Sequence, residues 1–296
     1  MFNPITALFH QISTGDVVLV LAIVLLGAWL LYQVGRALGI GWWGRLDRYA
    51  RFMGQIGIVL GMEQAYELTR GRIPHETDAA LLNAYRLLDF EWTHGMFIEQ
   101  RLEHFFLQFQ SLMTAVDLFY IIGHVGMTIG ALVWLYVWRR QRFGFMRNML
   151  MISTAIALVA FYLYPTAPPR LLWNYGFVDP LQLHHLVGAG GAQPGSYTYD
   201  PYAAMPSLHV AYALVATWSL VRAQSSRWVQ GLTLVYPVAM AAVVLISANH
   251  WVLDVFGAVA TVGIARVILF GMEQGFPRLT NLFQGATSSP PGAGAS

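Results

Sequence analysis

The sequence predicts an all-α fold, a polytopic membrane helical bundle. Of its 296 residues, 56% are hydrophobic and only 11% are charged, whereas soluble globular domains contain about 25% charged residues. The mean hydropathy of the chain is +0.51. Its apolar residues gather into runs close to the roughly 20 residues that a helix needs to cross a bilayer. These observations favour transmembrane helices over a water-soluble fold.

Six apolar runs are long enough to be predicted as transmembrane helices. In chain order they are Asp16–Gly35, Asp117–Trp138, Asn148–Tyr164, Met205–Val221, Trp228–Ser247 and Trp251–Gly271. A seventh segment, Arg51–Leu68, is more polar and is either a span or an interfacial helix. We therefore expect six or seven transmembrane helices.

Arginine clusters between the apolar runs predict the orientation of the chain. The stretches Arg139–Arg147 and Arg222–Arg227 are arginine-rich loops in this prediction, and the positive-inside rule places both in the cytoplasm. A third basic stretch, Arg36–Arg51, is cytoplasmic only if Arg51–Leu68 crosses the bilayer, which gives seven spans with the N-terminus outside. By alternation, the region Pro165–Ala204 lies on the outer side.

The segment Gly71–Val116 is too charged to cross the membrane, but its apolar residues recur at helical spacing. These residues are Leu81, Leu82, Tyr85, Leu88, Phe97, Leu102, Phe105 and Phe106. We expect amphipathic helices on the outer face of the bilayer. They serve either as a connector or in substrate access, and both interpretations stay open.

The chain contains no lysine and no cysteine, because all 17 of its Lys+Arg residues are arginines. This composition excludes Schiff-base chemistry, a Walker-type phosphate lysine, thiolate catalysis and cysteine metal sites. Phosphate recognition, if present, falls to arginine. The net charge of only +2 argues against nucleic acid as a partner.

Three polar clusters interrupt the apolar runs, and the predicted topology places all three at the outer membrane boundary. They are Tyr164–Arg170, Met205–His209 and Asn249–Asp254. In the third, His250 and Asp254 are four residues apart, so on a helix the carboxylate can accept the imidazole N–H. A polar pair that only ties a helix start to a loop is the structural alternative.

The other two clusters contain groups that suit an anion. The second cluster opens a predicted helix with Pro206 in its first turn, followed by Ser207 and His209. Helix N-termini favour phosphate through their unpaired N–H groups and dipole. Arg170 follows a proline-stiffened turn, and its planar guanidinium suits bidentate phosphate binding, although an arginine that reaches toward lipid head groups is an alternative. Two histidines, one of them paired with a carboxylate, and an arginine together provide the groups that phosphoryl transfer needs.

At these residues the sequence resembles the type 2 phosphatidic acid phosphatase superfamily, and more closely its inositol phosphorylceramide synthase-like branch of inositolphosphotransferases. The likeness extends from about Arg70 to Arg266, over motifs of the form Lys-x6-Arg-Pro, Pro-Ser-Gly-His and Ser-Arg-x5-His-x3-Asp. It implies a helical bundle in which His250 is the nucleophile. Further roles follow from the same likeness: Asp254 orients the nucleophile, His209 is the general acid/base, and Arg170 binds phosphate.

The chain departs from the motifs of the superfamily at two cationic positions. Leu163 replaces the lysine of the first motif, and Val243 and Val244 replace the Ser-Arg of the third. Smaller departures are Leu171 for a proline and Leu208 for a glycine. Two cationic phosphate ligands are therefore missing, so the phosphate site must be built differently. We expect Ser207, Asn249, backbone N–H groups or an outer-face arginine such as Arg70, Arg72 or Arg101 to help bind phosphate.

We therefore expect a membrane phosphoesterase or phosphotransferase that acts on a lipid phosphate or phospholipid head group through a phosphohistidine intermediate. Water as acceptor makes it a lipid phosphatase, and a lipid or sugar hydroxyl makes it an inositolphosphotransferase-like enzyme. One alternative is a non-catalytic lipid-binding or transport protein. Another is a metal site formed by His184, His185, His209 and His250, which we disfavour because adjacent histidines in a loop lack helical ligand spacing. No cofactor and no metal are expected.

The expected organisation is one integral-membrane catalytic domain over residues 1–280, with the phosphatase or phosphotransferase core at about 117–271. A cytoplasmic tail at 281–296, rich in Ser, Pro and Gly, is expected to be disordered. The expected location is a bacterial plasma membrane, with the active site on the outer side. The expected partners are the bilayer and the lipid substrate.

Overall fold

A computed structural model describes residues 14–38, 47–70, 77–178 and 202–275 of the chain, and it forms two compact units, Met1–Thr69 and Arg70–Ser296. The first unit contains α2 (Thr14–Ala37) and α3 (Asp47–Arg70). These two helices pack closely at Gly54, where the absence of a side chain permits the contact. A Cβ atom there would lie 2.4 Å from the Trp29 ring. Small residues permit such close helix contacts in membranes.

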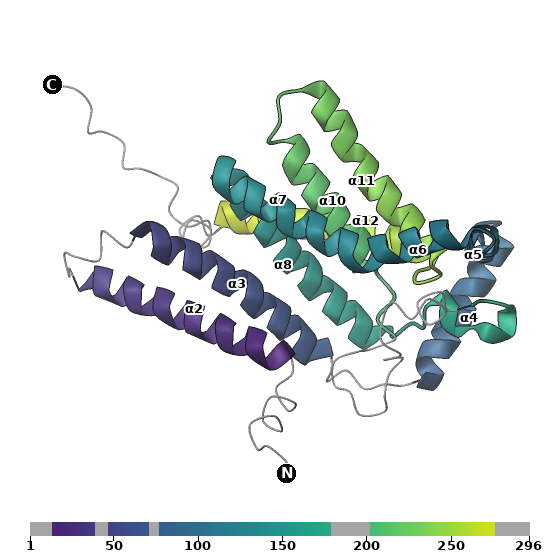
Figure 1. Cartoon of the computed structure of the whole chain (residues 1–296). Coiled ribbons are helices and arrows are strands. Elements are labelled where there is room, and N and C mark those ends of the chain that lie inside the picture. The colour runs from purple at the N-terminus through teal and green to yellow at the C-terminus, as the bar shows by residue number, and fades with distance from the viewer. Residues whose placement is uncertain (1–13, 39–46, 71–76, 179–201, 276–296) are drawn as a thin grey trace, which may run out of the picture. The chain divides into compact units, whose positions relative to one another are not determined.

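The second unit contains the site, and nearly all of its elements are helical. They are α4 (Thr77–Thr93), α5 (Glu99–Leu107), α6 (Gln110–Leu118), the π-helical turn η2 (Phe119–Gly123), α7 (His124–Trp138), α8 (Arg140–Leu163), the 3-10 turns η3 (Pro169–Leu171) and η4 (Trp173–Tyr175), α10 (Leu208–Val221), α11 (Arg227–Ile246) and α12 (Val252–Gly275). The predicted all-α fold class is therefore confirmed over the residues described (Figure 1).

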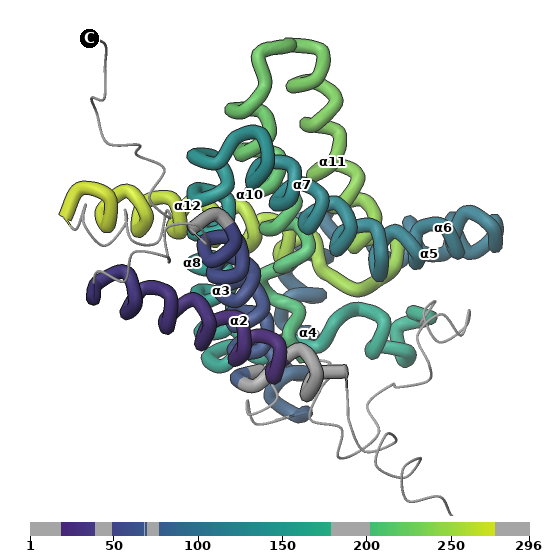
Figure 2. The backbone as a smooth tube through the Cα atoms, turned by 60° about the vertical axis from the view of Figure 1, so that its left-hand side comes forward, coloured from purple at the N-terminus to yellow at the C-terminus, as the bar shows by residue number. Residues whose placement is uncertain are grey.

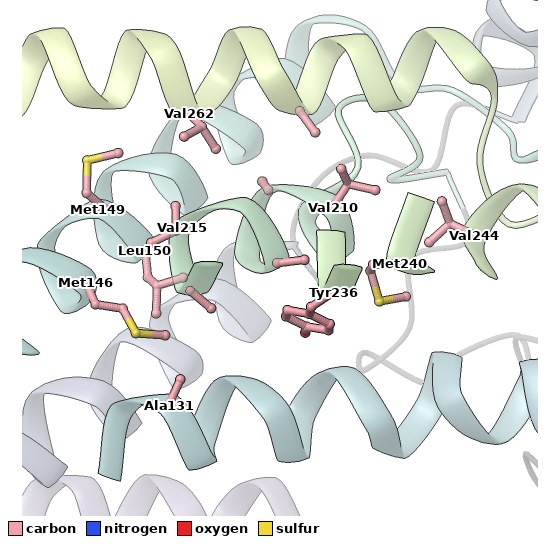
Figure 3. Packing of buried hydrophobic residues seen from close by; sticks show 14 of the residues in the cluster. Ala131, Met146, Met149, Leu150, Val210, Val215, Tyr236, Met240, Val244 and Val262 are labelled. Atoms are coloured by element: carbon pink, nitrogen blue, oxygen red, sulfur yellow. The ribbon is translucent and has the colours of Figure 1, made fainter. Parts of the chain in front are cut away.

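Helix α10 lies at the centre of this second unit and packs against α7, α8, α11 and α12, as Figure 2 also shows. Buried side chains from all five helices meet in one hydrophobic core (Figure 3). Ala131, Met149, Val210, Met240 and Val262 each come from a different one of these helices. The core therefore holds the two ends of α10 in place, including the end that bears His209.

Five helical stretches are long and apolar enough to cross a membrane, which indicates an integral membrane protein. They are Leu19–Ala37, Gln110–Trp138, Arg140–Leu163, Arg227–Ile246 and Val252–Gly275. Helix α10 is apolar but has only 14 residues, and α3 is not among the five. The total of six or seven spans and their orientation stay predictions, as does the single domain over residues 1–280. Residues 281–296 lie outside the described residues.

The predicted boundaries of two spans were wrong. Helix α8 begins at Arg140 rather than at Asn148, so most of the arginines assigned to a loop lie on helical turns. Arginine is a good helix former, and a polar side chain at a membrane boundary does not end a helix. Likewise, α6 begins at Gln110 and continues through η2 into α7, so the span predicted from Asp117 starts earlier.

Helices α4 and α5 occupy the segment predicted to form amphipathic helices. Helix α4 packs its apolar face, with Ala80, Ala84 and Leu87, into a second, smaller core that also contains Trp251. This smaller core lies where the loops of the candidate site meet. That these helices lie on the outer face of a bilayer stays a prediction.

Candidate active site

The segment after α8 lies beside the segment before α10. Helix α8 ends at Leu163 because Pro165 cannot continue a helix and disfavours helical geometry in the residue before it. The Thr166 N–H then donates to the Tyr202 carbonyl at 2.8 Å, in an isolated parallel bridge. The first two predicted clusters are thereby brought together.

The third cluster follows a sharp turn at the end of α11. Ala248 adopts a left-handed conformation, with φ of 50°, which turns the chain out of the helix. The Asn249 N–H donates to the Val244 carbonyl at 3.1 Å and the Ala248 N–H to the Leu245 carbonyl at 3.1 Å, a Schellman cap usually made by glycine. The Ala248 carbonyl accepts from the Arg170 N–H at 2.9 Å. The cap therefore joins the third cluster to the first.

His250 is buried and is held in one tautomer by two acceptors. Its Nδ1 lies 2.9 Å from the Ala204 carbonyl oxygen and 3.2 Å from Asp254 Oδ2. A carbonyl oxygen can only accept, so Nδ1 bears the proton and Nε2 has the lone pair of the neutral ring. The predicted His250–Asp254 contact is present, but not on one helix face: His250 lies in the turn before α12, which begins at Val252.

Three buried carboxyl groups accept hydrogen bonds from the backbone at the start of α12. Asp254 Oδ2 accepts from the Trp251 N–H at 2.9 Å, Glu99 Oε1 from the Val252 N–H at 2.7 Å, and Glu91 Oε1 from the Leu253 N–H at 2.7 Å. Acidic groups suit a helix N-terminus because of its unpaired N–H groups and dipole. This arrangement fixes the turn that presents His250.

Glu91 and Glu99, both fully buried, lie outside the clusters predicted from the sequence. One signal was available, since Glu91 continues the buried helical spacing of Ala84, Leu87 and Leu88 on α4. Burial raises the pKa of Glu91 to about 9, and the neighbouring Glu99 carboxyl adds to that rise. A carboxyl group on an otherwise apolar helix face is expected to be buried and to hydrogen-bond to another buried group rather than to water.

His209 is partly buried in the first turn of α10, with its ring centroid 5.7 Å from that of His250. Two further rings that were not predicted from the sequence contact it. Tyr120 stacks on His209 with centroids 4.3 Å apart, and His124 approaches to 4.3 Å. Both come from the π-helical turn and the start of α7, far from the recognised clusters in sequence.

Ser207 is the N-cap of α10, and its Oγ accepts a hydrogen bond from the Val210 N–H at 3.4 Å. The prediction that Pro206 lies in the first helical turn was wrong. Pro206 precedes the cap, after a cis peptide bond with Met205, because serine is a preferred N-cap residue and takes that position itself. The Ser207 N–H donates to the Asp254 carbonyl at 3.2 Å, so the starts of α10 and α12 are joined.

Arg170 is buried and hydrogen-bonded to the third cluster. Its Nε donates to Asn249 Oδ1 at 2.8 Å, and the Asn249 amide nitrogen donates to the Ser247 carbonyl at 3.1 Å and to Ser247 Oγ at 2.9 Å. The side chain of Asn249 therefore orients the guanidinium. Direct contact of Asn249 with phosphate stays a prediction.

We call these six predicted residues the polar cluster: Arg170, Ser207, His209, Asn249, His250 and Asp254. Hydrogen bonds and a ring contact link Ser207, Asp254, His250 and His209, and a hydrogen bond links Arg170 to Asn249, which precedes His250 in the chain. A family model described as the PAP2 superfamily matches residues 85–268, more than half of the chain, and this range includes the whole polar cluster. The chain belongs to the PAP2 superfamily. Membership of the PAP2 superfamily supports an enzyme with a phosphatase or phosphotransferase type of function.

A search of the curated proteins and a search of the solved structures find no match. The two positions at which the sequence lacks the cationic residues of PAP2 motifs differ in environment. Leu163 is 71% exposed, whereas Val244 is fully buried in the hydrophobic core. Among the described residues, Arg170 is the arginine that bonds within the polar cluster.

The alternative metal site gains no support from the residues that the structure describes, among which no three His, Asp or Glu side chains are grouped to hold an ion. His184 and His185 lie outside the described residues. The metal-independent mechanism therefore stays a proposal.

Proposed function

We propose that this member of the PAP2 superfamily is a metal-independent membrane enzyme that takes a phosphoryl or phosphoester group from a lipid phosphate or phospholipid head group. The observation that supports this proposal most directly is the tautomer of His250. The Nδ1–H group donates to the Ala204 carbonyl and to Asp254 Oδ2, so the lone pair of Nε2 is available to attack phosphorus.

In the first step, Nε2 of His250 forms a bond to phosphorus while the bond from phosphorus to the leaving alkoxide breaks. Protonated His209, whose ring lies 5.7 Å from the His250 ring, gives its proton to that alkoxide. Asp254 stabilises the positive charge on the His250 ring, as the carboxylate of a catalytic triad does. Arg170 balances the negative charge on the phosphoryl oxygens.

In the second step, neutral His209 takes a proton from the acceptor, whose oxygen attacks phosphorus as the P–N bond breaks. His250 returns to its starting state and His209 is again protonated. Water as acceptor gives a lipid phosphatase, and an alcohol gives a phosphotransferase. Which acceptor enters depends on how well the site excludes water.

The charge of the polar cluster favours transfer of the inositolphosphotransferase-like kind. Among the residues that the structure describes, Arg170 is the arginine bonded within it, and the carboxyl groups of Glu99 and Asp254 lie at the adjacent start of α12. One guanidinium balances the single charge of a phosphodiester better than the double charge of a phosphomonoester. Phospholipid diesters are therefore our preferred donors.

Purified protein in detergent, given phosphatidate, polyprenyl phosphate and phosphatidylinositol with and without alcohol acceptors, tests this proposal. Mass spectrometry should find released phosphate or a new phospholipid, and chelators should not reduce the rate. His250→Ala and His209→Ala should lose turnover but retain lipid binding. His94→Ala, which changes an exposed histidine on the turn after α4, is the matched control.

Full turnover in either site variant would exclude the histidine mechanism. Lipid binding without turnover by the wild-type protein would favour the non-catalytic alternative, and loss of activity with a chelator would favour a metal site.

We also propose a bacterial plasma membrane as the location, with the polar cluster on the outer side. A reporter fused near Trp173, in the loop between α8 and α10, should report the outer side, and one near Gln224, between α10 and α11, should report the cytoplasm. The reverse pattern would overturn this orientation.

A further inference from the structure

His209 is enclosed by rings from a helix that none of the recognised motifs includes. Tyr120 stacks on it at 4.3 Å with an interplanar angle of 23°, and His124 packs at 4.3 Å and 52°. His250 meets it edge-on at 5.7 Å and 61°. Tyr120 and His124 therefore contact the ring to which the proposed function assigns proton transfer.

The two additional rings come from a local irregularity of the helix. Tyr120 lies within the π-helical turn Phe119–Gly123, and His124 is the residue that closes it, through its N–H to the Phe119 carbonyl. Single π-helical turns inside α-helices occur frequently at functional sites. The His124 ring is oriented by this turn, because its Nδ1 lies 3.2 Å from the Tyr120 carbonyl. In the neutral ring, Nδ1 must therefore bear the proton.

The contacts also affect which charge state of His209 is favoured. A cation over the face of an aromatic ring is attracted by the ring quadrupole, so the parallel Tyr120 ring stabilises the imidazolium form. Among the residues that the structure describes, the titratable groups in ring contact with His209 are Tyr120 and His124 from the π-turn side and His250, backed by Asp254, from the α12 side. Like charges on adjacent imidazoles repel, so neutral rings at the neighbouring positions favour a proton on His209.

We propose that Tyr120 and His124 are positioning residues for His209, which hold its ring against His250 and favour its protonated form before leaving-group departure. The proposal rests on the proposed function for the step that His209 performs. The contacts themselves do not depend on which lipid is the substrate.

Kinetics of paired variants test this role. Tyr120→Leu removes the stacked ring and should lower kcat about tenfold, part of the 10²–10⁴ that general acid catalysis supplies, with less change in KM. It should also move the high-pH limb of the kcat profile to lower pH. Tyr120→Phe keeps the ring and should restore both readouts to near wild type. His124→Leu should lower kcat in the same direction.

Phe119→Leu is the matched control, because Phe119 lies on the same π-turn but packs against Tyr236 at 6.4 Å. It should leave the pH profile unchanged. Equal defects in Tyr120→Phe and Tyr120→Leu, or a wild-type profile in Tyr120→Leu, would overturn the proposal.

A second measurement does not need turnover. NMR of protein with isotope-labelled histidine, with the His209 signal assigned from His209→Ala, follows the protonation of that ring directly. The ring should titrate at lower pH in Tyr120→Leu than in wild type and in Tyr120→Phe. An unchanged titration overturns the inference even if the enzyme is active, whereas a shifted titration in a protein without turnover supports the contact and rejects the proposed function.

Discussion

Glu91 Oε1 lies 2.7 Å from the backbone nitrogen of Leu253 and accepts its hydrogen bond. A carboxyl group on α4 thereby supports the first turn of α12, next to His250. Burial, with the neighbouring Glu99 carboxyl, raises the pKa of Glu91 from 4.5 to about 9. Glu91 is therefore protonated at neutral pH in the folded protein.

The first prediction concerns stability and pH. Between pH 4.5 and 9 the folded protein holds a proton on Glu91 that the unfolded chain releases, so this group stabilises the fold fully below that window and loses its effect as pH rises through it. The apparent Tm of the wild type in detergent should fall from pH 6 to pH 9.5, and the apparent Tm of Glu91→Gln should fall less steeply over the same range. Asp89→Asn, an exposed change on the same helix, should follow the wild type. Identical slopes for Glu91→Gln and wild type would contradict the assignment.

Asp254→Asn should reduce kcat by about 10² to 10⁴, as the loss of an orienting carboxylate does in a catalytic triad. The amide oxygen can still accept from the Trp251 N–H, as Asp254 Oδ2 does at 2.9 Å, so the fold should persist. The charge that stabilises a cationic His250 is lost. Steady-state kinetics and circular dichroism on the same samples check both statements. Glu273→Gln, at the far end of α12, should stay within about twofold of wild type, and an equal loss there would point to a general effect of α12.

Arg170 and Asn249 should differ in the size of their effects. Arg170→Lys loses the planar fork and the Nε bond to Asn249 at 2.8 Å, and should lower kcat/KM about 10²-fold or more. Asn249→Ala leaves the guanidinium in place without its acceptor, and should cost roughly tenfold. Arg140→Lys, at the exposed start of α8, is the control. An Asn249→Ala defect as large as that of Arg170→Lys would instead indicate direct phosphate contact by the amide.

The sequence was sufficient to predict the helical bundle, because residue type and spacing along the chain indicate helices. It also singled out the six residues of the polar cluster, through polar breaks in the apolar runs and the likeness to superfamily motifs, and their roles stay predictions. Length and apolarity predict a helix, and His250 and Asp254 stand close in sequence. The supporting groups could not be found this way. Glu91 meets Leu253 across 162 residues, and Tyr120 meets His209 only because the π-turn and α10 pack together. Such contacts depend on tertiary packing, which local patterns do not contain.

Trp251 should be a principal determinant of stability beside the site. Its indole is fully buried, packs edge-on against Phe177, and donates to the Ala167 carbonyl at 2.9 Å. Trp251→Phe leaves that carbonyl without its donor, at a cost of about 1–3 kcal/mol, and Trp251→Ala adds a cavity, for a total of about 3–5 kcal/mol. In thermal unfolding in detergent, the apparent Tm should decrease in the order wild type, Trp251→Phe, Trp251→Ala.

The matched control for this prediction is Trp173→Phe, because Trp173 is 80% exposed and its ring contributes little to the packed interior. Its apparent Tm should stay close to that of the wild type. The backbone N–H of Trp251 donates to Asp254 Oδ2, so a turn loosened by loss of the indole should also displace Asp254, and the Trp251 variants should lose activity together with stability. A Trp251→Phe protein as stable as Trp173→Phe would show that the Ala167 bond does not hold the turn before α12.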